Sequence, residues 1–171
     1  MIHESVFIDP SAVIADDVSI GPFCHIGKNV TLESGCVIAS HVIINDNLTC
    51  KANVKIFSYV NIGNHKAAIS IGENTHVREF SLIGTDAECD KAVHIANDNF
   101  IMAYVRLSNG VTLGASCVLT NSVTLFEGVT CKEKVIVGGL STLEANTTIG
   151  TGVMIGGASY INRDMPPFTL V

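Results

Sequence analysis

Tryptophan is absent from this chain of 171 residues, and aromatic residues make up only 6% of it. Charged side chains are scarce as well, at 15%, and acidic residues outnumber basic ones to give a net charge of −6. The few Lys and Arg residues are scattered, whereas binding to nucleic acid or to an anionic membrane surface needs clustered basic charge. The composition therefore predicts neither nucleic acid nor an acidic lipid surface as a partner.

The chain also lacks recognisable targeting and membrane segments. Residues 1–4, Met-Ile-His-Glu, do not have the basic and apolar regions of a secretory signal peptide. No apolar run approaches the ~20 residues that a membrane-spanning helix requires. We therefore expect a cytoplasmic protein without a membrane span.

Metal-binding spacings of the Cys-x-x-Cys type are missing, although the chain contains six cysteines. All six fall on positions that the repeat described below predicts to face inward, where cysteine acts as a small apolar residue. We favour this interpretation over a redox or zinc site, and we predict no metal and no bound cofactor. The six positions are Cys24, Cys36, Cys50, Cys89, Cys117 and Cys131.

What the sequence has in abundance is hydrophobic residues at a fixed interval of six. Every sixth residue from Ile2 to Ile62 and, after a slip of three, from Ile71 to Ile161 is aliphatic or cysteine, which makes 27 positions. A smaller residue follows most of them four residues later. This period suits neither an α-helix nor a long alternating strand, but it is typical of short strands joined by corners in a parallel β-helix.

The repeat covers almost the whole chain, so we expect a single β-helix domain over residues 1–171. A short loop is predicted at 64–70, where the register slips. Residues 84–94 keep the period but have poor strand character, so they form either a coil with Cys89 inward or an extruded loop; the sequence leaves both open. Residues 162–171 contain Pro166 and Pro167, which cannot donate to a strand ladder, and should end the β-helix.

Several aromatic residues fall on positions that the repeat directs outward. They are Phe57, Phe80, Tyr104 and Phe126, and the mean hydropathy of +0.42 is high for a small monomer. Flat outer faces bury such residues only against another subunit, so we expect an oligomer.

Five short segments carry a resemblance to a known family. They are Ile-Gly-Pro-Phe-Cys at 20–24, Val-Arg-Glu-Phe at 77–80, Asp-Asn-Phe-Ile-Met-Ala-Tyr-Val at 98–105, Val-Gly-Gly-Leu at 137–140 and Asp-Met-Pro-Pro at 164–167. With the hexad repeat, they resemble the hexapeptide-repeat acyltransferases, and most of all the UDP-N-acetylglucosamine O-acyltransferase (LpxA) family, which begins lipid A synthesis. The resemblance implies a left-handed parallel β-helix, a homotrimer, and sites in the clefts between subunits. It also implies a sugar-nucleotide ligand and an acyl thioester co-substrate, on acyl carrier protein or coenzyme A.

The same resemblance indicates where the chemistry has changed. The family's general base, a histidine, falls on Asn109, which cannot accept a proton near neutral pH. Other cleft histidines of the family fall on Gly84, Arg106, Gly128 and Glu144. Among these, Glu144 is the candidate substitute base, because burial raises the pKa of a carboxyl group.

Besides the candidate base, the sequence contains candidate ligand-binding residues. Arg106 is suited to pair with a phosphate or carboxylate of a ligand, or with Glu127 or Glu144 across a subunit boundary. The other candidates are His65 in the shortened loop, His76 and Arg78 on a coil that borders the family's cleft, and Gly128. None of the six histidines has the sequence spacing of a base and its orienting carboxylate.

Three functions follow from these observations. The first is an acyltransferase of altered chemistry that transfers an acyl or acetyl group to a sugar nucleotide without the family's histidine. The second is a catalytically inactive paralogue that acts as a ligand-binding or partner trimer. The third is a purely structural solenoid.

Overall fold

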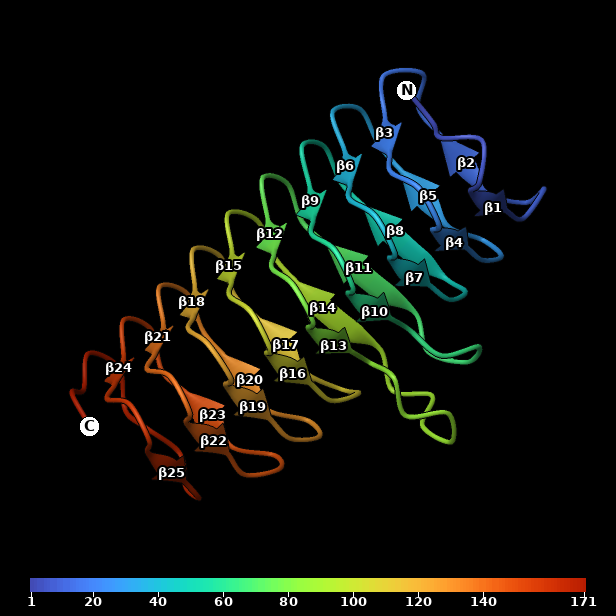
Figure 1. Ribbon diagram of the computed structural model, residues 1–171. Helices are drawn as coiled ribbons and strands as arrows, with labels where there is room; N and C mark the ends of the chain where they lie inside the picture. The colour runs from blue at the N-terminus through green and yellow to red at the C-terminus, as the bar shows by residue number, and fades with distance from the viewer.

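The computed structural model describes residues 1–171 as a three-sided coil of very short parallel strands (Figure 1). Sheet I contains β1 (Phe7–Ile8), β4 (His25–Ile26), β7 (Ile43–Ile44), β10 (Asn61–Ile62), β13 (Leu82–Ile83), β16 (Arg106–Leu107), β19 (Thr124–Leu125), β22 (Thr142–Leu143) and β25 (Tyr160–Ile161). Sheet II contains β2 (Val13–Ile14), β5 (Thr31–Leu32), β8 (Leu48–Cys50), β11 (Ile69–Ile71), β14 (Val93–Ile95), β17 (Thr112–Leu113), β20 (Thr130–Cys131) and β23 (Thr148–Ile149). Sheet III contains β3 (Ser19–Ile20), β6 (Val37–Ile38), β9 (Lys55–Ile56), β12 (His76–Val77), β15 (Phe100–Ile101), β18 (Val118–Leu119), β21 (Ile136–Val137) and β24 (Met154–Ile155).

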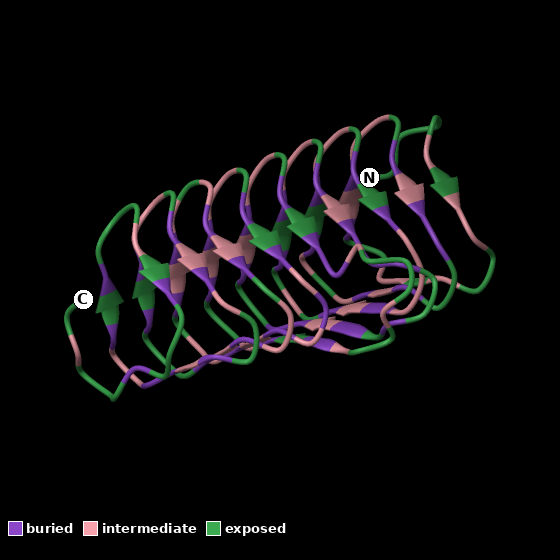
Figure 2. Cartoon of the chain, turned by 90° about the horizontal axis from the view of Figure 1, so that it is seen from below, coloured by how far each residue is buried: buried purple, intermediate pink, exposed green.

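The fold is the left-handed parallel β-helix that the repeat and the resemblance predicted. Three hexads make one coil, so that Ile20 pairs with Ile38 and Ile38 with Ile56 in sheet III. Each strand ends on a large residue that points inward, and 41 buried residues form one continuous core. Figure 2 shows the buried positions repeating along every face of the coil. Burial of this apolar column is the main stabilising contribution, at roughly 25 cal/mol per Å².

The corners between sheets use a left-handed backbone conformation. Asn29, Tyr59 and Leu140, for example, have φ angles of 54°, 64° and 63°. Asparagine tolerates this region better than most residues, whereas bulkier side chains adopt it at a cost of about 1–2 kcal/mol. The turn therefore recurs because the surrounding coils impose it, even where the sequence does not favour it.

Two loops interrupt the coil at the corner between sheets I and II. Leu48 pairs with Ile69, a spacing of 21 residues instead of 18, so three extra residues leave the coil after β10. Ile71 pairs with Ile95, a spacing of 24, so six extra residues leave it after β13. The segment that the sequence left undecided is therefore an extruded loop, whose excess length equals one hexad.

The prediction that Cys89 faces inward is consequently wrong. Cys89 lies half-buried in the second loop. The hexad count continued through the loop only because the insertion has the length of one repeat. The remaining five cysteines are buried in the core, and burial raises the pKa of the Cys131 thiol far above its ordinary value.

The closing segment returns to the coil after β25. Met165 pairs with Ile149, and Leu170 pairs with Met154, each through an isolated bridge. Met165 is buried and covers the end of the core. No helix in the structure has the length and apolar character needed to cross a membrane.

Candidate functional site

Two buried asparagines hold the second loop at the sheet I–II corner, one from the first loop and one from the next coil. The Asn64 Nδ2 donates to the carbonyl oxygens of Asp86 and of Cys89, the latter at 2.7 Å. From the other side, the Asn109 Nδ2 donates to the carbonyl oxygens of Cys89 at 3.2 Å and Lys91 at 3.4 Å. The Asn109 Oδ1 accepts from the Asp86 amide at 3.2 Å. Asn64 and Asn109, which we call the asparagine clamp, therefore fix the second loop.

This clamp gives Asn109 a structural role at the position where the resemblance placed a general base. Its side chain is buried, and both of its polar atoms are hydrogen-bonded to the loop backbone. A neutral amide in this setting holds backbone in place and does not take up a proton. No sequence signal pointed to this role, because the residues that Asn109 contacts lie in a loop that keeps the hexad period.

A hollow of about 210 Å³ lies at the foot of the second loop. Arg106 is exposed there and forms no ion pair within the chain. The nearby Glu127 is engaged instead by the Lys91 Nζ at 2.5 Å. Arg106 and Asn109 thus line the same hollow, and the guanidinium is left free for an anion. The lining residues are Thr85, Asp86, Arg106, Leu107, Ser108, Asn109, Phe126 and Glu127.

The remaining positions where the resemblance placed histidines follow the same side of the coil. Gly84 comes directly after β13, Gly128 lies in the corner after β19, and Glu144 follows β22. Gly128 has a φ angle of 72°, and a Cβ there would collide with the Asn146 side chain. Glu144 is half-buried, and its backbone carbonyl accepts a hydrogen bond from Thr147 Oγ1 at 2.8 Å. These positions line the edge of sheet I in successive coils.

His76 and Arg78 belong to a different face of the molecule. Burial lowers the pKa of His76, which lies in β12 of sheet III, and the positive charges of Lys55 and Arg78 lower it further. The Arg78 Nε donates to Glu79 at 2.8 Å, and its guanidinium lies 4.6 Å from the centre of the Phe57 ring. This hydrogen bond holds the pKa of Glu79 below its ordinary value. Within one chain, neither residue lines the hollow beside Arg106.

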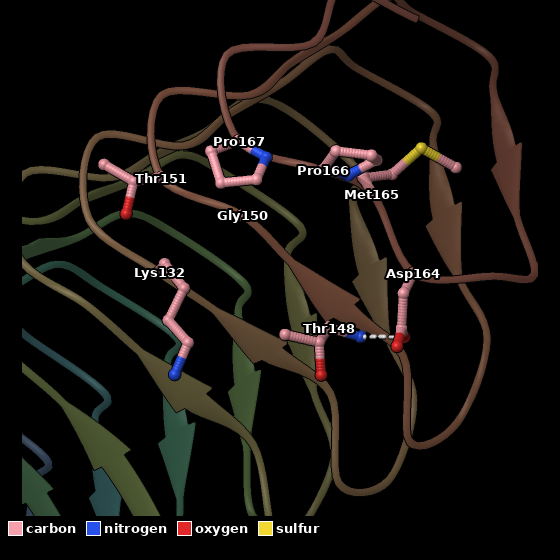
Figure 3. Close-up of a pocket in the computed structure, with 8 residues that line it drawn as sticks. All are labelled: Lys132, Thr148, Gly150, Thr151, Asp164, Met165, Pro166 and Pro167. Carbon is pink, nitrogen blue, oxygen red and sulfur yellow. Dashed lines mark hydrogen bonds between the residues drawn. The ribbon is translucent and has the colours of Figure 1, made fainter.

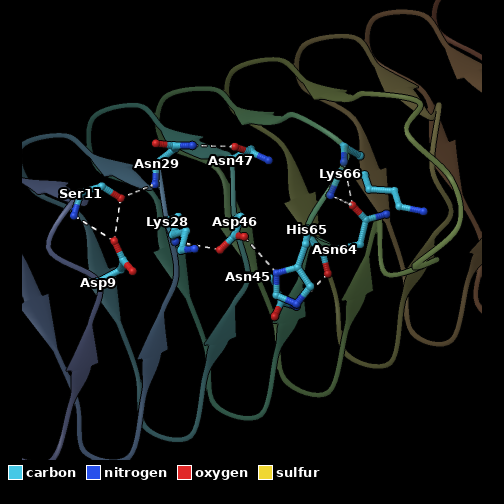
Figure 4. A network of polar contacts seen from close by, with 12 residues as sticks. Asp9, Ser11, Lys28, Asn29, Asn45, Asp46, Asn47, Asn64, His65 and Lys66 are labelled. Atoms are coloured by element: carbon cyan, nitrogen blue, oxygen red, sulfur yellow. Dashed lines mark hydrogen bonds and ion pairs between the residues drawn. The ribbon is translucent and has the colours of Figure 1, made fainter.

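His65 has a carboxylate partner that sequence spacing did not reveal. Its Nδ1 lies 3.0 Å from Asp46 Oδ2, and Figure 4 shows the two side chains meeting across neighbouring coils. The pair lies outside the sequence spacing by which a base and its orienting carboxylate were sought. The two residues are 19 apart in sequence, and the 18-residue coil brings them side by side. A search for His and Asp about one coil apart would have found the pair.

Another hollow, of about 520 Å³, lies near the C-terminal end and is bounded by the closing segment (Figure 3). Asp164 anchors that segment, because its Oδ1 accepts from the Thr148 amide at 2.8 Å. None of the predicted site residues lines this hollow, and its only charged side chains are Lys132 and Asp164.

Two relatives decide the family of the chain. The acyl-[acyl-carrier-protein]–UDP-N-acetylglucosamine O-acyltransferase of Campylobacter concisus is 30% identical over 186 residues, covering 99% of this chain and 69% of the relative. The enzyme of the same name from Aliarcobacter butzleri is 36% identical over 179 residues, with the same coverage. The chain belongs to this acyltransferase family.

Similarity in three dimensions agrees with that assignment. The structure of LpxA from Acinetobacter baumannii has a TM-score of 0.94 to this chain at 31% identity, covering 99% of this chain and 69% of that one. The family model of the GMPPB C-terminal domain also matches, over residues 2–104. The chain thus spans about two thirds of the length of its acyltransferase relatives.

Proposed function

We propose that this member of the acyltransferase family binds a sugar nucleotide at the edge of sheet I and transfers an acyl group to it from a thioester, without a base at position 109. The observation that carries the proposal is the combination of a free guanidinium and an occupied amide in one hollow. Arg106 is available to an anion, whereas Asn109 is committed to the clamp.

The chemistry of the hollow suits the phosphate part of a sugar nucleotide. A guanidinium presents a fixed set of donors that matches phosphate oxygens, and it stays charged at all physiological pH values. The proposed acyl donor is a thioester of acyl carrier protein or of coenzyme A. The relatives' names specify acyl carrier protein. A neighbouring subunit of a homotrimer would complete the cleft, covering the exposed Phe126.

A second candidate function is an inactive paralogue that binds the sugar nucleotide without turnover. It is favoured by the absence of any imidazole from the lining of the Arg106 hollow. A structural solenoid without a ligand is the third alternative, and the same experiment separates all three.

The experiment combines binding and turnover. UDP-N-acetylglucosamine should raise the melting temperature, and incubation with acyl-coenzyme A or acyl carrier protein thioesters should give an acylated sugar nucleotide, detected by mass spectrometry. Arg106→Ala should weaken nucleotide binding at least tenfold, while Arg163→Ala, in the exposed closing segment, should not. Binding without product would establish the inactive paralogue, and no thermal shift with any ligand would leave the structural solenoid.

A further inference from the structure

We infer that His65, oriented by Asp46, is the general base that replaces the missing histidine of the family. The inference rests on the proposed function, since it assigns the proton acceptor for that transfer. The substrate group would be a hydroxyl or amine of a sugar whose diphosphate is held by Arg106.

The geometry of the pair is that of an oriented base. Asp46 Oδ2 lies 3.0 Å from His65 Nδ1, and the Asp46 side chain is 18% exposed while that of His65 is 75% exposed. A carboxylate that accepts from Nδ1–H leaves the Nε2 lone pair free to take a proton from a substrate. The carboxylate is therefore sheltered, and the ring extends into solvent where a ligand reaches it.

Backbone groups of the preceding coil hold the Asp46 carboxylate in place. Its Oδ1 accepts from the Lys28 amide at 2.8 Å. A Cβ on Gly27 would lie only 2.6 Å from the same Oδ1, so the carboxylate occupies space that any other residue at this position would fill. The hydrogen bonds from His65 and Lys28 outweigh desolvation and lower the pKa of Asp46, which keeps it ionised.

A hollow of about 270 Å³ surrounds the pair. The rings of Phe7 and His25 stack there with their centres 4.8 Å apart, in β1 and β4, on the side of His65 away from Arg106. Lys28 also lines the hollow and adds a positive charge.

The position along the coil places His65 near Arg106. His65 follows β10, and Arg106 lies in β16, two strands further along sheet I. Strands in a sheet are about 4.8 Å apart, so the two sites are separated by about 10 Å along the axis. A diphosphate bound at Arg106 would thus place its attached sugar toward His65.

The step that follows is balanced. The acceptor oxygen or nitrogen attacks the thioester carbonyl carbon and loses its proton to His65 Nε2. The new C–O or C–N bond forms as the C–S bond breaks, and the proton on Nε2 passes to the departing thiolate. No oxidant, reductant or metal is needed.

Steady-state kinetics with UDP-N-acetylglucosamine and the thioester that serves the wild-type protein test the inference. His65→Ala should lower kcat by about 10²–10⁴-fold with little change in KM, because a base acts on the reacting proton and contributes little to ground-state binding. Asp46→Asn and Gly27→Ala should lower kcat less, through misorientation of the ring. Added imidazole should restore part of the activity of His65→Ala, which a purely structural role would not permit.

His94→Ala is the matched control, since His94 is an exposed histidine on sheet II bonded to Ser70 at 3.0 Å. It should leave kcat unchanged. Turnover by the wild-type protein that survives in His65→Ala would overturn the inference and leave the proposed function standing. Absence of product from the wild-type protein would overturn the proposed transfer, and the inference with it.

Discussion

Single asparagines decide how the functional corner is built. Asn64 and Asn109 each bond to the backbone of the second loop, and both donate to the carbonyl oxygen of Cys89. A buried amide satisfies several backbone groups at once, and its removal leaves these groups without partners. Position 109, where the resemblance placed the family's histidine, therefore carries a structural contact.

Asn109→Ala should release the second loop. We expect a loss of about 1–3 kcal/mol in the free energy of unfolding, because buried partners are left unsatisfied. Amide hydrogen exchange of residues 84–92 should become faster, and that of sheet III should not change. Asn121→Ala, at an exposed corner without a side-chain hydrogen bond, is the control and should stay within about 0.5 kcal/mol of the wild type. Equal exchange in both variants would contradict the clamp.

His76 makes stability depend on pH. Burial and the neighbouring charges lower its pKa in the folded protein, so the unfolded chain, with a pKa near 6.5, binds the proton more readily. The neutral ring therefore makes its full contribution to the free energy of unfolding above about pH 6.5. This contribution is lost as the pH falls below that value.

Urea denaturation at pH 7.5 and pH 5 measures this effect. The wild-type protein should lose more stability on acidification than His76→Phe, whereas His94→Phe should behave like the wild type. The same pH dependence in the wild type and His76→Phe would exclude His76 as its source.

At the scale of elements, one corner carries a column of neighbouring rings, of which three of the four successive pairs are stacked and the Phe23–His41 pair is tilted by 41°. Phe23, His41, Tyr59, Phe80 and Tyr104 occupy the same place in consecutive coils between sheets III and I, with neighbouring ring centres 4.9–5.1 Å apart. All five adopt the left-handed conformation, which is unfavourable for large side chains. Stacking between coils offsets part of that cost.

A double-mutant cycle on Tyr59 and Phe80 tests this column. Their rings are parallel to within 2° at 5.1 Å, and such a pair contributes about 0.5–1.5 kcal/mol beyond its buried area. Tyr59→Ala and Phe80→Ala should each destabilise the protein, with a coupling energy in that range by urea denaturation. Additive effects would show that the rings are stacked without stabilising one another.

The whole molecule is a prism whose outer faces carry apolar groups. Val37, Ile43, Ile136 and Met154 are exposed on sheets I and III, and Phe126 is exposed beside the Arg106 hollow. Exposed patches of this kind mark surfaces that bind another chain. A trimer would bury them and enclose the edge of sheet I between subunits.

Light scattering should accordingly give a mass three times that of the 18.1 kDa chain. Replacement of Ile136 by Asp should shift the assembly toward monomer, because a charge on a buried face is costly to desolvate. Asp in place of the exposed Lys134, at a corner with a φ angle of 58°, is the control and should leave the mass unchanged. A monomeric wild-type protein would contradict the trimer.

The hexad repeat determined the architecture from sequence alone. Ile38, Leu113 and Leu143 were expected inside, and each is fully buried, because every coil repeats the same local pattern and each prediction is supported by its neighbours.

The tertiary structure alone decided what happens where the repeat is interrupted. Whether Cys89 lies in a coil or a loop depends on the spacing of paired strands, and a loop of one hexad leaves no trace in the period. The contact of Asp46 with His65 depends on the number of residues in one turn of the coil. The period shows which side chains face inward. Contacts between coils also depend on how many residues each intervening loop contains. Only the folded structure shows which residues leave the coil as a loop.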